Sequence, residues 1–245
     1  MSCSKSMPLT FFFFFSVFLH LANAADPLYH ICFNPENYTA KSAFGANLNT
    51  LFNVLSVQAP PSGFGVVSTG QYYNKVNGLA LCRGDVSSTD CKTCVVHASY
   101  ELRNLCSYNK GAVIWYDNCM LKYSDTYFFG QIDGQNEFSL LNVKDVKDPE
   151  SFNPKVHELL SSLSYKASST LKFYATGEME LEESEKLYGL AQCTRDLSSG
   201  DCKKCLYEAI SKIPNCCSGK RGGRVVGGSC TVHYELYPIV NGTGY

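Results

Sequence analysis

Five cysteines recur along the chain at a constant offset of 111 residues. They are Cys82, Cys91, Cys94, Cys106 and Cys119 in the first copy and Cys193, Cys202, Cys205, Cys217 and Cys230 in the second. Neighbouring residues recur with them, since Asp90-Cys91-Lys92 returns as Asp201-Cys202-Lys203. A constant offset with no net insertion indicates two copies of one domain in tandem.

The first 24 residues have the three features of a secretory signal peptide. Lys5 gives a positive start, residues 9–21 are almost entirely apolar, and Ala22-Asn23-Ala24 supplies a small-residue cleavage pattern. The apolar run is too short for a membrane span, and His20 interrupts it. We therefore expect cleavage after Ala24, no membrane span and a mature protein secreted to the extracellular space (the apoplast of a plant).

The secretory route agrees with two other sequence features. The chain has 13 cysteines, and removal of Cys3 with the leader leaves twelve, an even number. Asn37 and Asn241 each begin a glycosylation sequon. The charge of the chain argues against nucleic acid as a partner, because 21 basic and 22 acidic residues give a net charge of −1. A chain without a basic excess lacks the electrostatic signature of a nucleic-acid-binding protein.

Each copy predicts the same succession of elements. An extended segment precedes a helix (39–56 in the first copy, 154–167 in the second), then come strands, a second helix and a closing pair of strands. The runs Ser87-Ser88-Thr89-Asp90 and Ser198-Ser199-Gly200-Asp201 are helix-start signals ahead of the second helix. Antiparallel strands with helices on one side make an α+β fold. We expect two tandem copies of a small antiparallel sheet packed with two helices, at 25–129 and 138–242, joined by a linker at 130–137.

The cysteine spacing allows three chemistries. Cys-x2-Cys is a zinc ligand pair in many proteins, and Cys91-Lys92-Thr93-Cys94 could be a redox motif. A secreted chain with an even number of cysteines favours a third, a disulfide scaffold, and the pattern lacks the βαβ context of redox motifs. The spacing alone leaves fifteen pairings for six cysteines.

The doubled Cys-x8-Cys-x2-Cys motif resembles the plant cysteine-rich repeat secretory proteins, which carry two ginkbilobin-homologous (stress-antifungal) domains. The resemblance covers essentially the whole mature chain, including residues 219–224 before the last cysteine and 234–238 after it. It implies five disulfide bonds: Cys32–Cys106, Cys82–Cys91, Cys94–Cys119, Cys193–Cys202 and Cys205–Cys230. The second copy has no counterpart of Cys32 and carries Cys216 beside Cys217. These two either bond to each other or pair outside the domain.

No catalytic constellation is visible in the sequence. The histidines of the mature chain lie outside any nucleophile or metalloprotease motif. The acidic run at 178–185 is interpreted as a solvated turn rather than a pair of glycosidase carboxylates. We expect a non-enzymatic protein without a metal or cofactor.

The resemblance also implies a mannose-binding site. In this family an Asn near the N-terminal cysteine, an Arg before the last cysteine and a Glu after it bind the sugar. The second copy matches all three with Asn142, Arg224 and Glu235, whereas the first copy has Phe33, Val113 and Ser124.

Two other interpretations stay open. Arg224 and Glu235 could form a surface ion pair with no binding role. Alternatively, the tandem domains could be a protein-interaction module that contacts an extracellular receptor or a cell-wall protein without binding sugar. The resemblance implies a plant defence, antifungal or stress-response role in either case.

Overall fold

The computed structural model describes residues 26–181 and 185–240, so the leader at 1–24 and the sequon at Asn241 lie outside the described residues. The first domain comprises β1 (Tyr29–Cys32), α1 (Ala43–Gln58), β2 (Phe64–Thr69), the 3₁₀ helix η1 (Tyr72–Asn74), β3 (Val76–Cys82), α2 (Ser88–Leu105), β4 (Gly111–Trp115) and β5 (Cys119–Ser124). The second comprises β6 (Glu137–Leu141), α3 (Pro149–Ser168), β7 (Tyr174–Glu180), β8 (Lys186–Cys193), α4 (Ser199–Cys217), β9 (Gly222–Gly227) and β10 (Cys230–Glu235).

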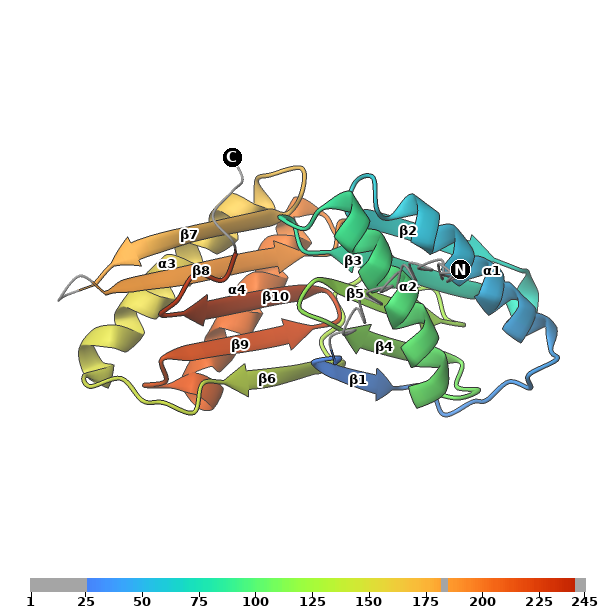
Figure 1. Cartoon of the computed structure of the whole chain (residues 1–245), viewed down its shortest axis with the longest axis horizontal. Helices are drawn as coiled ribbons and strands as arrows, with labels where there is room; N and C mark the ends of the chain where they lie inside the picture. Colours follow the sequence, from blue (N-terminus) through green and yellow to red (C-terminus); the bar gives the residue numbers. More distant parts are fainter. Residues whose placement is uncertain (1–25, 182–184, 241–245) are drawn as a thin grey trace, which may run out of the picture.

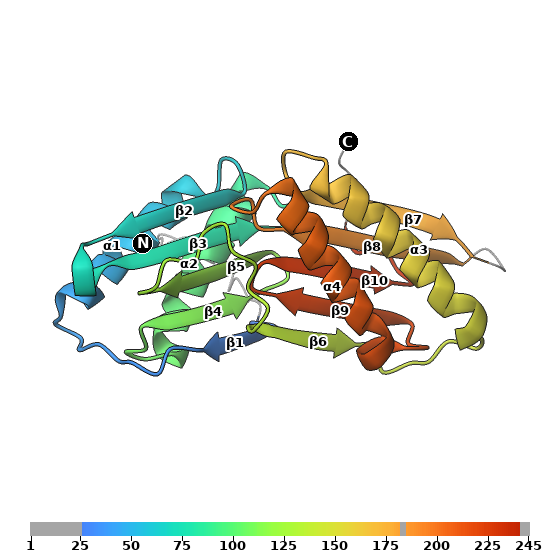
Figure 2. The same ribbon diagram turned by 180° about the vertical axis from the view of Figure 1, so that it is seen from behind.

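Each domain is one five-stranded antiparallel sheet with two helices, which confirms the expected α+β duplication. The strand orders β1-β4-β5-β3-β2 and β6-β9-β10-β8-β7 are the same order applied to the two copies. Helices cover only one side of each sheet. Figures 1 and 2 show that the helices of the two domains lie on opposite sides of the molecule. The other side of each sheet is called its helix-free face below.

The helices α2 and α4 begin where the sequence predicts. The Ser87 hydroxyl accepts a hydrogen bond from the Asp90 backbone N–H and donates one to the Asp90 carboxylate, and Ser198 repeats both bonds with Asp201. Capping of this kind satisfies backbone donors that the first helical turn leaves free. It also fixes the start of the helix that carries two of the repeated cysteines.

Six disulfide bonds join the cysteines of the described chain. Five connect the pairs that the family resemblance implies: Cys32–Cys106, Cys82–Cys91, Cys94–Cys119, Cys193–Cys202 and Cys205–Cys230. The sixth joins the neighbours Cys216 and Cys217 at the end of α4. The second domain therefore lacks a bond from its first strand to its second helix.

Three apolar clusters hold the chain together. In each domain, one cluster lies between the sheet and its own two helices. The third lies on the helix-free face of the first sheet, where Trp115 and Met120 pack with Val226 of the second domain. Phe128 and Phe129, from the segment that connects the domains, pack against this third cluster.

Several element boundaries differ from the sequence expectation. The first helix of each copy covers 43–58 rather than 39–56 and 149–168 rather than 154–167. β7 continues to Glu180, because Glu178 and Glu180 pair across the sheet with Tyr188 and Lys186. Part of the acidic run is therefore strand rather than turn. The connection between the sheets covers 125–136, and Glu137 already belongs to β6.

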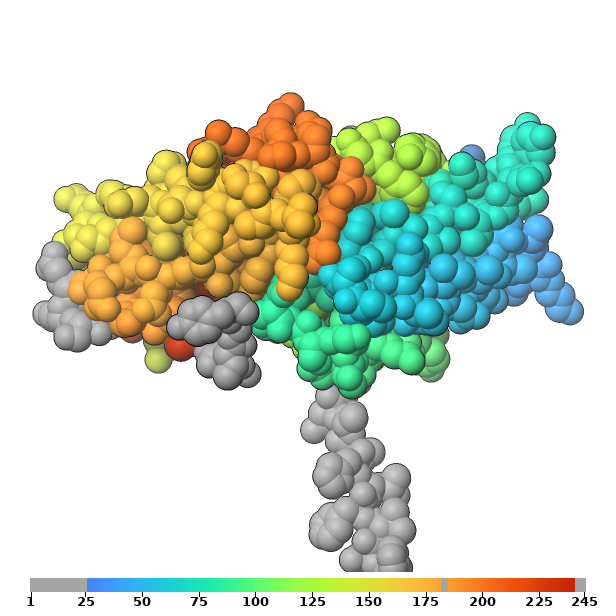
Figure 3. Space-filling view, turned by 90° about the horizontal axis from the view of Figure 1, so that it is seen from above, coloured from blue at the N-terminus to red at the C-terminus, as the bar shows by residue number. Residues whose placement is uncertain are grey.

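The sheets meet end to end, and the space-filling view shows the two domains in continuous contact (Figure 3). Direct hydrogen bonds cross the junction. The Trp115 indole donates to the Gly227 carbonyl at 3.1 Å, and the Gln192 amide donates to the Cys82 carbonyl at 2.9 Å. Gln192 occupies the position of Leu81 in the repeat, so this bond has no counterpart in the other direction.

Candidate functional site

The register of the second sheet places the three expected sugar-binding residues on its helix-free face. Arg224 of β9 lies opposite His233 of β10, and Gly222 lies opposite Glu235. Asn142 follows β6 and donates its backbone N–H to the Gly222 carbonyl. Residues opposite one another on adjacent strands point to the same face. Asn142, Arg224 and Glu235 therefore share one face, with Gly222 between Asn142 and Glu235.

Register also shows which residues of the two copies correspond at the first strand. Cys32 lies opposite Ala112, and Leu141 lies opposite Gly223, which is the repeat of Ala112. Leu141 thus stands where the first domain has Cys32. Asn142 accordingly takes the position of Phe33.

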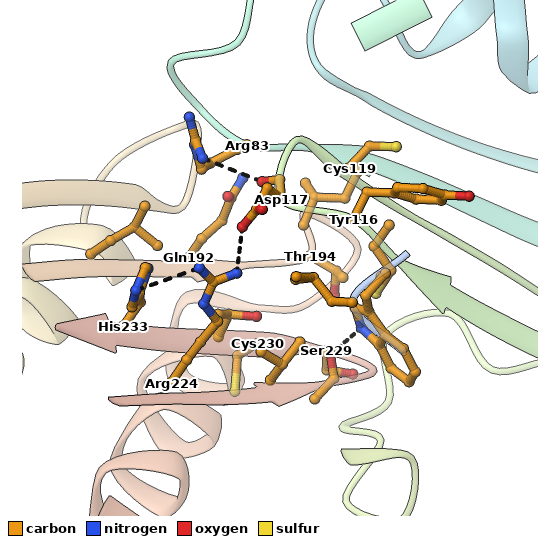
Figure 4. Close-up of a pocket in the computed structure, with 18 residues that line it drawn as sticks. Arg83, Tyr116, Asp117, Cys119, Gln192, Thr194, Arg224, Ser229, Cys230 and His233 are labelled. Carbon is orange, nitrogen blue, oxygen red and sulfur yellow. Dashed lines mark hydrogen bonds and ion pairs between the residues drawn. The ribbon is translucent and has the colours of Figure 1, made fainter. Parts of the chain in front are cut away.

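Arg224 bridges the two domains. Its guanidinium donates to the Asp117 carboxylate of the β4–β5 turn at 2.7 Å and approaches His233 Nε2 at 3.5 Å (Figure 4). Glu235 Oε1 lies 3.3 Å from the same His233 nitrogen. The result is a chain of polar groups, Asp117–Arg224–His233–Glu235, that runs from the first domain onto the face of the second sheet.

His233 cannot satisfy both of its neighbours at once. Burial lowers the pKa of His233, although Glu235 opposes that shift, and the ring is therefore neutral near pH 7. A neutral ring either accepts from Arg224 at Nε2 or donates from Nε2 to Glu235. One neighbour always keeps an unused donor or acceptor.

The other carboxylate oxygen of Glu235, Oε2, also has unused hydrogen-bonding capacity. The residue is only 8% exposed, and its Oε2 is buried without a partner at hydrogen-bond distance. The Tyr237 hydroxyl is the neighbouring donor, and burial together with its proximity to Glu235 raises the pKa of Tyr237. The carboxylate lies directly on Gly222, where a Cβ would be 1.8 Å from Oε2. An unpaired buried acceptor of this kind is costly unless water or a ligand supplies a donor.

A cavity of about 70 Å³ opens beside this cluster at the domain junction. The first domain contributes Arg83, Trp115 and Asp117 to its walls, and the second contributes Gln192, Arg224 and His233 (Figure 4). Pockets that enclose a small molecule measure about 300–1,000 Å³. This cavity therefore admits the polar edge of a ligand and not the whole of it.

The corresponding positions of the first sheet carry different chemistry. Val113 replaces Arg224 and is buried in the third apolar cluster, and Ser124 replaces Glu235. The Phe33 ring covers Gly111, the repeat of Gly222, in the place that the Glu235 carboxylate takes in the second domain. The first sheet thus lacks the charged donor and acceptor.

Two residues of the site escaped the sequence interpretation. His233 precedes Glu235 by two positions, so strand alternation alone would have placed both on one face. Asp117 carried no such signal. It lies in the other repeat and reaches Arg224 only because the two sheets meet end to end.

Metal ligation has little support in the described part of the chain. The group of metal-ligating side chains found together there is His30, Cys32 and Cys106. Two of these are bonded to each other as a disulfide, which has no thiolate to bind a metal. Within the same residues, every helix is too short or too polar to cross a lipid bilayer.

Comparison with known proteins identifies the family. The model of the salt stress response/antifungal family matches the chain twice, at residues 31–126 and 141–237. The chain belongs to this family. Both matches fall on the repeats found in the sequence, and they leave out residues 127–140, which include most of β6.

Relatives and solved structures agree with this assignment. The antimicrobial ginkbilobin-2-like protein of Castanea crenata is 64% identical over 230 residues, covering 94% of this chain and 95% of that protein. Cysteine-rich repeat secretory protein 38 of Arabidopsis thaliana is 53% identical, covering 87% and 85%. The crystal structure of the tandem DUF26 ectodomain of the Arabidopsis thaliana cysteine-rich receptor-like protein PDLP8 matches with a TM-score of 0.76 at 28% identity, covering 85% of this chain and 97% of that one.

Proposed function

We propose that this chain is a secreted, non-enzymatic defence protein that binds mannose-type glycans through Asn142, Arg224 and Glu235 of its second domain. The leader-like N-terminus and relatives named as secretory support an extracellular location. A 64% identical relative named as antimicrobial supports a role in defence.

The observation that carries the proposal is the unused hydrogen-bonding capacity around His233. Arg224 and Glu235 compete for one ring nitrogen, and Glu235 Oε2 has no partner at hydrogen-bond distance. A sugar hydroxyl is both donor and acceptor, so a pair of hydroxyls could accept from Arg224 and donate to Glu235. Bonds to charged side chains are the stronger ones, which suits a ligand that is itself uncharged.

The dimensions of the site restrict how a sugar could bind. Of the three proposed residues only Arg224 lines the cavity of about 70 Å³. We therefore expect the cavity to receive a hydroxyl bound by Arg224, while the rest of the glycan stays in solvent. Asn142 follows the edge strand beyond Gly222, and its Oδ1 already accepts a hydrogen bond from the Lys144 backbone N–H. We therefore expect its side-chain N–H groups to contact the sugar from the outer side. Binding by one edge leaves most of the sugar hydrated, and we therefore expect a weak monosaccharide affinity that increases on multivalent glycans.

Calorimetric titration of the oxidised mature protein with methyl α-mannoside tests this function. Saturable heat is expected from the wild type and should be lost in Arg224→Ala and in Glu235→Gln. Glu158→Gln is the matched control, because Glu158 is exposed on α3 at the opposite side of the sheet. Absence of saturable heat from correctly bonded wild-type protein would contradict the proposal.

One observation favours recognition of a protein partner instead. Tyr72 and Tyr73 are 88% and 92% exposed on η1, and Tyr72 has a positive φ of 48°. Backbone strain of this kind clusters at functional sites, and tyrosines are enriched among the residues that dominate binding at protein interfaces. Capture of a partner from plant extracellular fluid, lost in Tyr72→Ser and retained in Arg224→Ala, would support this second function.

A further inference from the structure

A second and larger depression lies on the helix-free face of the first sheet. Its volume is about 600 Å³, within the range of ligand-binding sites and far above that of the junction cavity. Residues 33–36 after β1 form one wall, and the connecting segment forms the other. Figure 2 shows the yellow-green connection on this side of the first sheet before it enters β6. This depression is called the first-sheet groove below.

A buried ion pair fixes the floor of the first-sheet groove. Lys122 Nζ lies 2.6 Å from Asp133 Oδ2, and the two side chains are only 6% and 9% exposed. Asp133 also accepts hydrogen bonds from the backbone N–H groups of Gln135 and Asn136 and from the Asn136 side chain. The connection is therefore held against the sheet by a saturated set of bonds, and the groove is formed before any ligand arrives.

Aromatic side chains line the same groove. Tyr127 is 56% exposed, and its ring packs edge-on against Phe129 at 5.1 Å between centroids. Phe128 packs on Phe129 at 4.8 Å and lies 4.4 Å from Lys122 Nζ. Rings held in place in this way offer apolar faces at a low cost in side-chain entropy.

Hydroxyls, amides and carboxylates supply the polar groups of the groove, and ion pairs engage three of its charged residues. Lys122 is neutralised by Asp133, and Glu36 pairs with Lys110 at 2.6 Å. The Asn34 amide donates to Asp125 at 2.7 Å, while Gln131 and Gln135 are exposed along the connecting segment. Lys122 is the cation among the lining residues, and its charge is engaged. Outside the lining, Lys75 Nζ lies 5.7 Å from the centroid of the Tyr127 ring, which leaves the other face of that ring for a ligand.

We propose that the first-sheet groove binds an internal stretch of an uncharged oligosaccharide, with Tyr127 as the stacking platform and Gln131 as a hydroxyl-binding amide. Aromatic faces match the apolar C–H faces of sugar rings, and amides match their hydroxyls. A groove that is open along its length accommodates a chain, in contrast to the terminal residue expected at Arg224. The site goes beyond the function proposed above, because Asn142, Arg224 and Glu235 do not line it.

The test is titration calorimetry of the full mature protein with four neutral β-1,4-linked hexasaccharides, of glucose, xylose, mannose and N-acetylglucosamine. At least one should bind saturably, and Tyr127→Ala should weaken that binding tenfold or more. Gln131→Ala should weaken it several-fold and, being an exposed change, leaves folding intact. Tyr100→Ala is the matched control, because it removes a more exposed tyrosine on α2, on the other side of the first sheet.

Four outcomes would overturn the proposal. They are no binding of any hexasaccharide, equal binding by Tyr127→Ala and Tyr100→Ala, tighter binding of a hexagalacturonate than of every neutral probe, and loss of hexasaccharide binding in Glu235→Gln. Glu235→Gln separates the two sites. Hexasaccharide binding lost with Glu235 would assign it to the second domain, whereas methyl α-mannoside binding should survive Tyr127→Ala.

Discussion

Arg224 of the second domain and Asp117 of the first are joined by a hydrogen-bonded ion pair of 2.7 Å across the domain junction. Asp117 is exposed in the β4–β5 turn, and its repeat in the second domain is Gly228, which has no side chain to form such a pair. The contact therefore exists once in the molecule. The ion pair occupies the Arg224 guanidinium, which is also the proposed hydrogen-bond donor to mannose.

Removal of this contact should favour ligand binding. In Asp117→Ala, Arg224 no longer has to leave a carboxylate before it donates to a sugar. An ion pair of this exposure contributes about 0–1 kcal/mol, so the gain in methyl α-mannoside affinity should be at most about fivefold. Calorimetry measures the gain, and the free energy of unfolding should fall by less than about 1 kcal/mol. Glu180→Ala is the control, because it also removes a surface ion pair, to Lys186, and should leave the affinity for methyl α-mannoside unchanged. A loss of affinity in Asp117→Ala would instead make Asp117 a ligand-binding residue.

Two adjacent glycines should respond differently to the same substitution. In Gly222→Ala the new Cβ meets the Glu235 carboxylate, the end of a flexible side chain that can move away. We expect mannoside binding to be lost with little change in stability. In Gly223→Ala the new Cβ lies 2.7 Å from Cys217 Cβ and 2.8 Å from the Tyr234 ring, both in the core. That variant should lose about 1–3 kcal/mol of stability. Urea denaturation and calorimetry on both variants check the contrast, and equal losses of stability would refute it.

Acidification should destabilise the second domain through His233. Burial lowers the pKa of His233 below its ordinary 6.5, Glu235 opposes the shift and Arg224 adds to it. The unfolded chain therefore binds a proton more readily than the folded one. The stability that the neutral ring contributes is full above pH 6.5 and is lost as the pH falls through the folded pKa.

Urea midpoints measured from pH 7.5 to pH 5 should show this dependence. His233→Gln cannot titrate and should flatten the profile. The exposed His157 on α3 provides the control, because His157→Gln should leave the profile unchanged. A wild-type midpoint that rises on acidification would show that Glu235 outweighs burial.

The repeat made most of the fold predictable. A constant offset of 111 residues predicts that both sheets have the same strand order, and capping at Ser87 and Ser198 places the starts of α2 and α4. Element ends were less predictable. β7 runs on to Glu180 because cross-strand pairing with Lys186 overrides the turn character of an acidic run.

The site was predictable only within one repeat. Alternation along β9 and β10 is enough to bring Arg224, His233 and Glu235 to one face. Asp117 could not be foreseen, because nothing in the sequence specifies how the two sheets meet. The first-sheet groove depends on the connecting segment folding back over its own sheet through the Lys122–Asp133 pair. Both charges are unremarkable in the sequence and become informative only once buried.

The sheet register predicts how the missing bridge of the second domain can be restored. Leu141 occupies the position of Cys32, and Cys217 occupies that of Cys106. The Cys32–Cys106 bond closes a sequence separation of 74 residues, whereas the Cys216–Cys217 bond joins neighbours and constrains no loop. The double variant Leu141→Cys with Cys216→Ser should therefore form a bond from the first strand to α4.

Such a bond should raise the free energy of unfolding by about 2–4 kcal/mol, because it restricts the unfolded chain. Peptide mapping of the non-reduced protein identifies the new pairing, and guanidinium denaturation measures the gain. Cys216→Ser alone is the control, since it removes the neighbouring bond without supplying a new partner for Cys217. A double variant that leaves both thiols free would show that Leu141 and Cys217 lie further apart in solution than Cys32 and Cys106 do.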